Sequence, residues 1–297
     1  MIIDSHTHTG QIFYPVGKNR VSNLPADDLI AAMKKYSIDY ALVSSIEGAE
    51  FDSDGQLAPP DKQNPQLESF HDLLSFIERI NGGTHSSNFP SFYERRGAPS
   101  NRGGVVSRPS LKALLWIKPY TENPTPALEQ FITRNRDHIA GFKMHPSLSR
   151  MKFTDDRFRP YLDMARKFEM PVQVHTENDG FSDLKYVAEI ASVYQDTDFV
   201  IVHMGLNTNN EEGIRIVQAH QNIYGDTCEV KHNNVIRAID ECGSEKILFG
   251  TDAIVHGIDT YAGYLPLVDR IRTNFSLEQA ENVLFRNCQR IFNLPLC

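Results

Sequence analysis

Short apolar runs typical of buried strands alternate along this chain with segments that carry apolar residues at helical spacing. The strand-like runs lie near residues 3, 42, 115, 142, 173, 201, 224 and 248, and a helical pattern fills each interval between them. Eight strands separated by helices predict an α/β protein with a parallel sheet. The number of repeats favours a (β/α)8 TIM barrel over an open doubly wound sheet, and no glycine-rich nucleotide-binding motif follows any strand.

One segment interrupts this rhythm. After the second strand, residues 46–110 contain a predicted helix over 66–80 and then a stretch dominated by glycine, serine, asparagine and proline. We interpret 46–110 as an insertion within a single domain spanning 1–297, because it has too few apolar residues for a core of its own. Two interpretations stay open: a decorative surface loop, or a lid that carries Arg95, Arg96, Arg102 or Arg108 over the site.

Composition excludes several classes of function. The 297-residue chain is 40% hydrophobic and has a formal net charge of −8, which argues against a broad nucleic-acid or acidic-membrane surface. It contains neither an apolar segment long enough to span a bilayer nor a leader-like N-terminus, so we expect a cytoplasmic protein. The four cysteines (Cys228, Cys242, Cys288 and Cys297) lack CxxC spacing and are expected to be reduced, mostly structural thiols.

The first strand, MIIDSHTHTG, carries the first candidate for chemistry. Side chains at alternate positions of a strand share a face, so Asp4, His6 and His8 point to the same side. Two imidazoles held at this spacing form half of a zinc-type site. For this motif alone, a polar strand end that meets water is an equally good interpretation.

Other strands also end in residues able to bind a metal ion. Apolar runs lead directly into them, and an unpaired polar group buried there is costly, so a shared cation satisfies several at once. This is the face where barrel enzymes place their chemistry. Each histidine taken alone is compatible with a structural role, but the set favours a metal site. Its members are Lys143 and His145 on the fourth strand, His175 on the fifth, His203 on the sixth and Asp252 on the eighth.

These motifs resemble a known superfamily. HTH, VHTEN, VHMG and FGTDA on the first, fifth, sixth and eighth strands are similar to amidohydrolase motifs. GFKMHP and the NVLFRNCQRIFNL tail resemble the amidohydrolase-related branch, which includes hydrolases and aminocarboxymuconate-semialdehyde-type decarboxylases. The resemblance covers nearly the whole barrel but not the insertion. The chain departs from many relatives after Asp252, where Ile254, Val255 and His256 replace a loop with proline, and His256 either touches substrate or faces solvent.

The resemblance implies a divalent ion, zinc in preference to manganese, held by His6, His8, His175 and Asp252. His203 is then a catalytic acid/base, or a ligand if two ions are bound. Lys143 bridges two ions only if its amine is carboxylated. His145 lies two residues further along the same strand, so its side chain is on the same face as that of Lys143. We prefer one ion to two.

This site predicts hydrolysis of an amide, lactone or ester of a small molecule by metal-activated water. Asp252 passes a proton to the leaving group and His203 steadies the oxyanion, while Asp4 orients a ligand histidine. One alternative is a decarboxylase, with Arg95 or Arg108 binding the substrate's acid group. A second alternative is a non-catalytic metal-binding barrel, in which replacing Asp252 leaves function intact. Because dimers are common among the proteins it resembles, a homodimer is the expected assembly.

Overall fold

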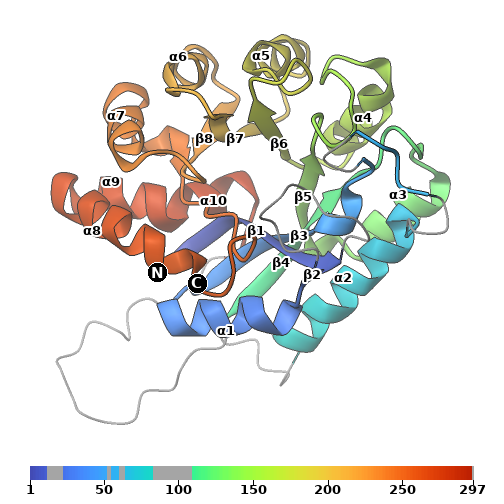
Figure 1. Cartoon of the computed structure of the whole chain (residues 1–297), viewed down its shortest axis with the longest axis horizontal. Coiled ribbons are helices and arrows are strands. Elements are labelled where there is room, and N and C mark those ends of the chain that lie inside the picture. Colours follow the sequence, from blue (N-terminus) through green and yellow to red (C-terminus); the bar gives the residue numbers. More distant parts are fainter. Residues whose placement is uncertain (12–22, 52–54, 60–63, 83–108, 296–297) are drawn as a thin grey trace.

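The computed structural model describes residues 1–11, 23–51, 55–59, 64–82 and 109–295 (Figure 1). Within these ranges the strands form one nine-stranded sheet in the order β2-β1-β3-β4-β5-β6-β7-β8-β9. All neighbouring strands are parallel except β2, which pairs antiparallel with β1. The strands are β1 (Ile3–Gln11), β2 (Asn23–Leu24), β3 (Tyr40–Ser45), β4 (Ser110–Trp116), β5 (Ile139–Met144), β6 (Val172–Glu177), β7 (Phe199–Leu206), β8 (Ile223–Asp226) and β9 (Ile247–Leu248).

The sheet curls until its last strand meets its first. Ser5 N donates to Phe249 O at 2.8 Å, and Asp252 N donates to His6 O at 2.9 Å. These bonds join the segment that follows β9 to β1. All eight strands predicted from the sequence are present, and the short β2 is an addition. The arrangement is consistent with the predicted (β/α)8 barrel.

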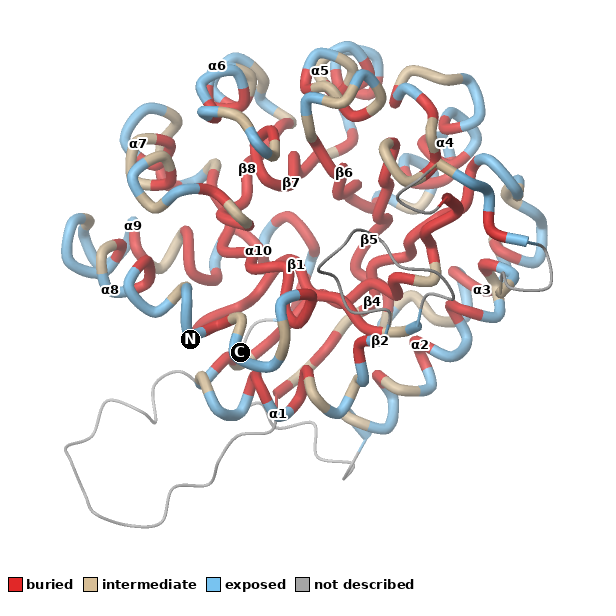
Figure 2. Tube along the Cα trace, viewed as in Figure 1, coloured by how far each residue is buried: buried red, intermediate tan, exposed pale blue. Residues whose placement is uncertain are grey.

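Helices cover the outside of the curled sheet. β3 and β5 are buried along their whole length, as expected for parallel strands packed on both faces. Figure 2 shows the strands in red and the outward helix faces in pale blue. Each helix connects two successive parallel strands and was predicted by its apolar spacing; together they are α1 (Ala26–Tyr36), α2 (Gln66–Asn81), α3 (Pro126–Arg134), α4 (Arg159–Lys167), α5 (Leu184–Val193), α6 (Glu211–Ala219) and α7 (His232–Cys242).

The described part of the predicted insertion is more regular than a loop. It contains a short 3₁₀ turn, η1 (Ile46–Gly48), and then α2, which connects β3 to β4. The Asn81 side chain donates to Leu111 O at 2.8 Å and accepts from Leu111 N at 3.0 Å, which fixes the end of α2 to the start of β4. Residues 83–108, with Arg95, Arg96, Arg102 and Arg108, lie outside the described residues, and the lid prediction falls on them.

The C-terminal segment consists of several short helical pieces. A 3₁₀ segment η7 (Thr260–Tyr264) leads into α8 (Leu265–Asn274), and α9 (Leu277–Glu281) and α10 (Asn287–Ile291) are separated by a π-helical segment, η8 (Asn282–Arg286). Within the π-helical segment, Val283 O accepts from Phe249 N at 3.0 Å, which joins this segment to the residue that follows β9. Among the described helices, none is both long and apolar enough to cross a membrane.

Candidate metal centre

The two histidines of β1 point into the curled sheet at the carboxyl ends of its strands. The pairing of β1 with β3 shifts register between Asp4 and Thr7, and the Thr7 hydroxyl donates to Leu42 O at 2.9 Å, so Thr7 faces away. The Nε2 atoms of His6 and His8 lie 3.0 Å apart. Both side chains are buried.

Asp252 joins this pair from the far end of the sheet. Its Oδ1 lies 2.9 Å from His8 Nε2 and 3.5 Å from His6 Nε2. Its backbone has a φ of 61°, a left-handed conformation that costs a non-glycine residue about 1–3 kcal/mol. The bond from Asp252 N to His6 O offsets part of that cost and fixes the carboxylate over the histidines. Ligand atoms of one zinc-class ion lie roughly 3 Å apart, so the three groups match such an ion.

Lys143 on β5 reaches the same point. Its Nζ lies 2.9 Å from His6 Nε2, and the side chain is fully buried. Burial lowers the pKa of Lys143, while the nearby Asp252 and Asp226 carboxylates oppose that shift. With a pKa of about 8, the Lys143 amine is still mostly protonated near pH 7, but it reaches the neutral form that carboxylation requires more readily than an exposed lysine does.

His175 and His145 lie beside this group of three rather than within it. The His145 ring stacks between Trp116, with centroids 5.1 Å apart, and His175, at 3.8 Å. His145 Nδ1 accepts from Leu148 N at 3.2 Å, which caps the turn after β5. His175 Nε2 lies 3.4 Å from Glu177 Oε2, so in this structure its ligand nitrogen faces a carboxylate.

His203 approaches from β7. Its ring centroid lies 5.7 Å from that of His6 and 4.9 Å from that of His175. Its Nδ1 lies 3.1 Å from Cys228 O, an acceptor, so Nδ1 carries the proton and Nε2 keeps the lone pair. His203 has a φ of 68°, and Asp226 Oδ1 accepts from its backbone N at 2.9 Å.

Asp226 at the end of β8 was not among the predicted site residues, although, like Asp252, it ends a strand predicted from the sequence. It is fully buried, and its Oδ2 lies 3.3 Å from His6 Nδ1. Burial raises the pKa of Asp226, against the effect of the N–H groups that donate to it. Asp4, predicted to orient a ligand histidine, accepts instead from the backbone N of His6 at 3.0 Å. Asp226 is thus the carboxylate that faces the imidazole.

Electrostatics favour the forms that bind a metal. Burial lowers the pKa of His6, His8, His175 and His203, so these imidazoles are neutral near pH 7. Burial opposes ionisation of Asp252, but the hydrogen bond from His8 and the electrostatic interaction with His6, His8 and His203 hold the pKa of Asp252 well below its usual range. Neutral imidazoles and an ionised carboxylate directed at one point fit a divalent ion.

His256 lies at the rim of the centre. Its side chain is half exposed, and its Nε2 lies 2.6 Å from Glu229 Oε1. Glu229, Asp252 and His256 offer ligand-type atoms within 4.8 Å of one another. His256 therefore lies near the site and is also open to solvent. Arg95 and Arg108 lie outside the described residues.

A family model described as amidohydrolase matches residues 114–294, more than half of the chain. No curated protein matches. Among solved structures, a zinc-bound amidohydrolase from Burkholderia multivorans has a TM-score of 0.67 at 14% identity, covering 99% of this chain and 100% of that one.

Two further structures share the fold. The 5-carboxyvanillate decarboxylase from Sphingomonas paucimobilis has a TM-score of 0.60 at 13% identity, with 99% of both chains covered. A probable 2-pyrone-4,6-dicarboxylic acid hydrolase from Acinetobacter baumannii has a TM-score of 0.63 at 11% identity, again with 99% of both chains covered. The resemblance read from the motifs is confirmed. The chain belongs to the amidohydrolase family, whose members are metal-dependent enzymes.

Proposed function

We propose that this chain is a (β/α)8-barrel enzyme that hydrolyses an amide, lactone or ester bond of a small molecule with one divalent ion, zinc in preference to manganese. The observation that carries the proposal is the convergence of His6 Nε2, His8 Nε2 and Asp252 Oδ1 within 3.5 Å of one another. His175 is the fourth candidate ligand, and reaching the ion requires its ring to leave Glu177. When bound, the ion supplies a Lewis acid that activates water and polarises the carbonyl.

The chain's own residues then have distinct roles. Asp252 is ionised and buried, so it can take a proton from the attacking water and deliver it to the leaving group. Because its Nδ1 donates to Cys228 O, His203 keeps Nε2 as a proton acceptor, and it steadies the oxyanion once Nε2 has taken up a proton. Asp226 holds the His6 ring in orientation. The buried walls formed by Trp116 and His145 exclude water from one side.

A metal-dependent decarboxylase is the second candidate, and Lys143 is the observation that favours it. Its buried amine lies beside His6, where it offers a positive partner for a substrate carboxylate. His203 or Asp252, after taking up a proton from water, would then donate that proton to the carbanion left by loss of CO₂. The fold neighbour from Sphingomonas paucimobilis is itself named as a decarboxylase.

The test compares the wild type with Asp252→Asn and with Asp259→Asn, in which a carboxylate outside the centre is replaced. Protein stripped of metal with a chelator is supplied with zinc. It is then assayed for hydrolysis of small amides, lactones and esters, and for CO₂ release from small carboxylic acids. We expect zinc-dependent hydrolysis, lowered by about 10²–10⁴-fold in Asp252→Asn and unchanged in Asp259→Asn. CO₂ release without hydrolysis would select the decarboxylase, and full hydrolysis by Asp252→Asn would contradict the proposed mechanism.

A further inference from the structure

Trp116 ends β4 with its ring beside the candidate centre, and its indole N–H has no acceptor among the described residues. The side chain is only 4% exposed, so water has little access to this group. A buried donor without a hydrogen bond destabilises the fold, and a buried tryptophan N–H usually has a partner. The unpaired indole therefore indicates an acceptor that the chain itself does not provide.

The Trp116 ring is held in one position by its neighbours. The His145 ring stacks on it at an interplanar angle of 11°, and the centroid of the His8 ring lies 5.5 Å from that of Trp116. A Cβ atom at Gly48 would overlap Cδ1 and Cγ of the indole, so glycine lets the backbone pack directly on the ring. The N–H bond is fixed in the ring plane and cannot rotate as a hydroxyl does. An acceptor must come to it.

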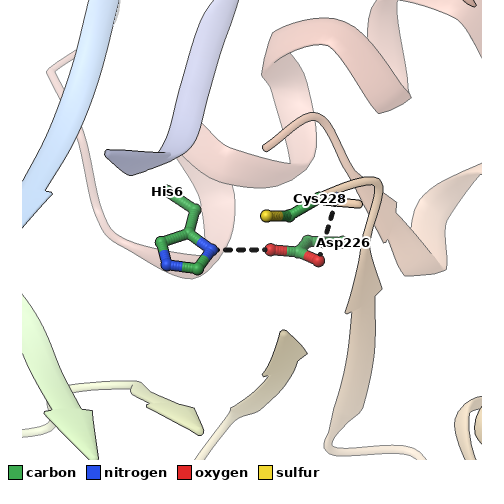
Figure 3. Close-up of side chains that lie close together, drawn as sticks. All are labelled: His6, Asp226 and Cys228. Atoms are coloured by element: carbon green, nitrogen blue, oxygen red, sulfur yellow. Dashed lines mark hydrogen bonds and ion pairs between the residues drawn. The ribbon is translucent and has the colours of Figure 1, made fainter. Parts of the chain in front are cut away.

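Polar groups on the β8 side of the centre, in contrast, are paired with one another. Figure 3 shows Asp226 and Cys228 at the end of β8 beside His6, with the Asp226 carboxylate facing the imidazole at 3.3 Å. Asp226 Oδ1 also accepts from the backbone N of Cys228 at 3.2 Å. A bound molecule would therefore gain a new hydrogen bond on the β4 side, from Trp116, rather than on the β8 side.

Lys143 lies next to Trp116 on the neighbouring strand. The two residues are register partners in the pairing of β4 with β5, and Lys143 Nζ lies 6.0 Å from the centre of the indole ring. The amine contacts His6 Nε2, the same lone pair that a metal ion at the candidate centre would use. With that lone pair taken, a buried amine needs another partner. A carboxylate that reaches both residues would satisfy the amine and the indole N–H together.

We propose that Trp116 is a substrate-binding residue whose indole N–H, together with the Lys143 amine, binds a carboxylate group of the substrate. The inference rests on the proposed function and deepens it, because it selects small acids whose carboxylate is separate from the bond that is hydrolysed. Trp116 is enclosed to the same degree as His8 and Asp252, which are 5% and 4% exposed. Burial therefore excludes substrate from the indole no more than from the proposed reaction centre.

Trp116 is the only tryptophan of the chain, so its indole ¹H–¹⁵N resonance reports on this contact alone. Zinc-loaded full-length protein is titrated with acetate, succinate and benzoate, and with acetamide as an uncharged counterpart. A hydrogen bond to a carboxylate deshields the indole proton. We expect a saturable downfield shift with at least one carboxylate and a smaller shift with acetamide, while calorimetry on the same titrations gives the affinity.

Two variants test whether the N–H group itself is responsible. Trp116→Phe keeps an aromatic ring against His145 but removes the donor. It should weaken carboxylate binding by about 10–100-fold, as expected for a hydrogen bond to a charged group, without changing the zinc content. Tyr161→Phe is the matched control, because it removes a buried polar group from an aromatic ring that contacts Gln66 instead. It should bind the carboxylates as the wild type does.

The outcomes separate this inference from the proposed function. Carboxylate binding that leaves the indole resonance unmoved overturns the inference, as does equal affinity in Trp116→Phe or failure of all three carboxylates to bind. Zinc-dependent hydrolysis is measured separately. Its absence in protein that shows the indole shift leaves the carboxylate site standing and refutes the proposed function alone. Because the wild-type resonance reports the contact directly, the result does not depend on folding of Trp116→Phe.

Discussion

Asp4 lies buried beneath the candidate centre, where it supports the backbone that carries the two β1 histidines. The Thr251 hydroxyl donates to its Oδ2 at 2.5 Å and the His6 N–H to its Oδ1 at 3.0 Å. Burial raises the pKa of Asp4 to about 7, although both of these hydrogen bonds act in the opposite direction. Asp4 joins the first strand to the segment after β9. Its burial removes the carboxylate from water, which disfavours the ionised form.

This raised pKa has a defined effect on stability. An acid with a higher pKa in the folded state binds more protons when folded, so its contribution to the free energy of unfolding is fully present below about pH 4 and is lost as pH rises through about 7. We expect Asp4→Asn to flatten the stability curve of the chelated protein between these values, by up to about 4 kcal/mol. Urea unfolding at several pH values measures the free energy of unfolding. Asp156→Asn, which replaces an exposed carboxylate, is the control. Parallel curves for wild type and Asp4→Asn would refute the assignment.

At single positions, the sequence predicts which side chains reach the centre better than it predicts their partners. His6, His8 and Asp252 converge because strand alternation and strand ends decide their direction. The contact between His6 Nδ1 and Asp226 depends on the curl of the sheet, which brings β8 next to the inward face of β1. The rule that selected Asp252, an acidic residue ending a buried strand, also selects Asp226. Asp252 was chosen because it lies in the FGTDA motif, and Asp226 lies in no such motif.

Among the elements, the closing helices hold the short last strand in place. β9 has only two residues, and Asn287 on α10 donates to Ile247 O at 2.8 Å and to Ser244 O at 2.7 Å. Asn287 is buried, so these carbonyls have little access to water. The segment that follows β9 carries Asp252, which makes this anchor important for the site as well as for the fold.

We expect Asn287→Ala to lower the free energy of unfolding by about 2–3 kcal/mol, because it removes two hydrogen bonds and leaves buried carbonyl groups unpaired. Ser276→Ala removes the exposed capping box of α9 and should cost about 1 kcal/mol. Chemical denaturation of both variants measures the difference. If Ser276→Ala lowers the free energy of unfolding as much as Asn287→Ala does, burial does not determine the strength of these contacts.

Element positions were predictable where periodicity is local. Each of the eight strands and the connecting helices follows from its own apolar pattern. The π-helical segment over 282–286 was not predicted, and its Val283 O accepts from Phe249 N, which lies more than thirty residues away. The two-residue strand β2 likewise exists only as a pairing with the end of β1. Features produced by distant backbone partners leave no periodic signal in the sequence.

At the scale of the whole molecule, the candidate centre spans the seam where the sheet closes. His6 and His8 belong to the first strand and Asp252 follows the last, and backbone hydrogen bonds such as Asp252 N to His6 O already join them. An ion bound by all three would link the two ends of the sheet directly. Such a ligand stabilises only the folded state, since the unfolded chain separates these residues by more than two hundred positions.

Zinc should therefore raise the melting temperature of the chelated protein. At a free concentration of one hundred times its dissociation constant, a ligand adds about 2.7 kcal/mol. For a chain of this size that corresponds to an increase of roughly 5–10 °C. The His6→Ala/His8→Ala variant removes two ligands and should lose most of the increase, whereas Cys242→Ser should keep it. Differential scanning calorimetry with and without zinc measures the shift, and an equal increase in the double variant would show that the stabilising ion binds elsewhere.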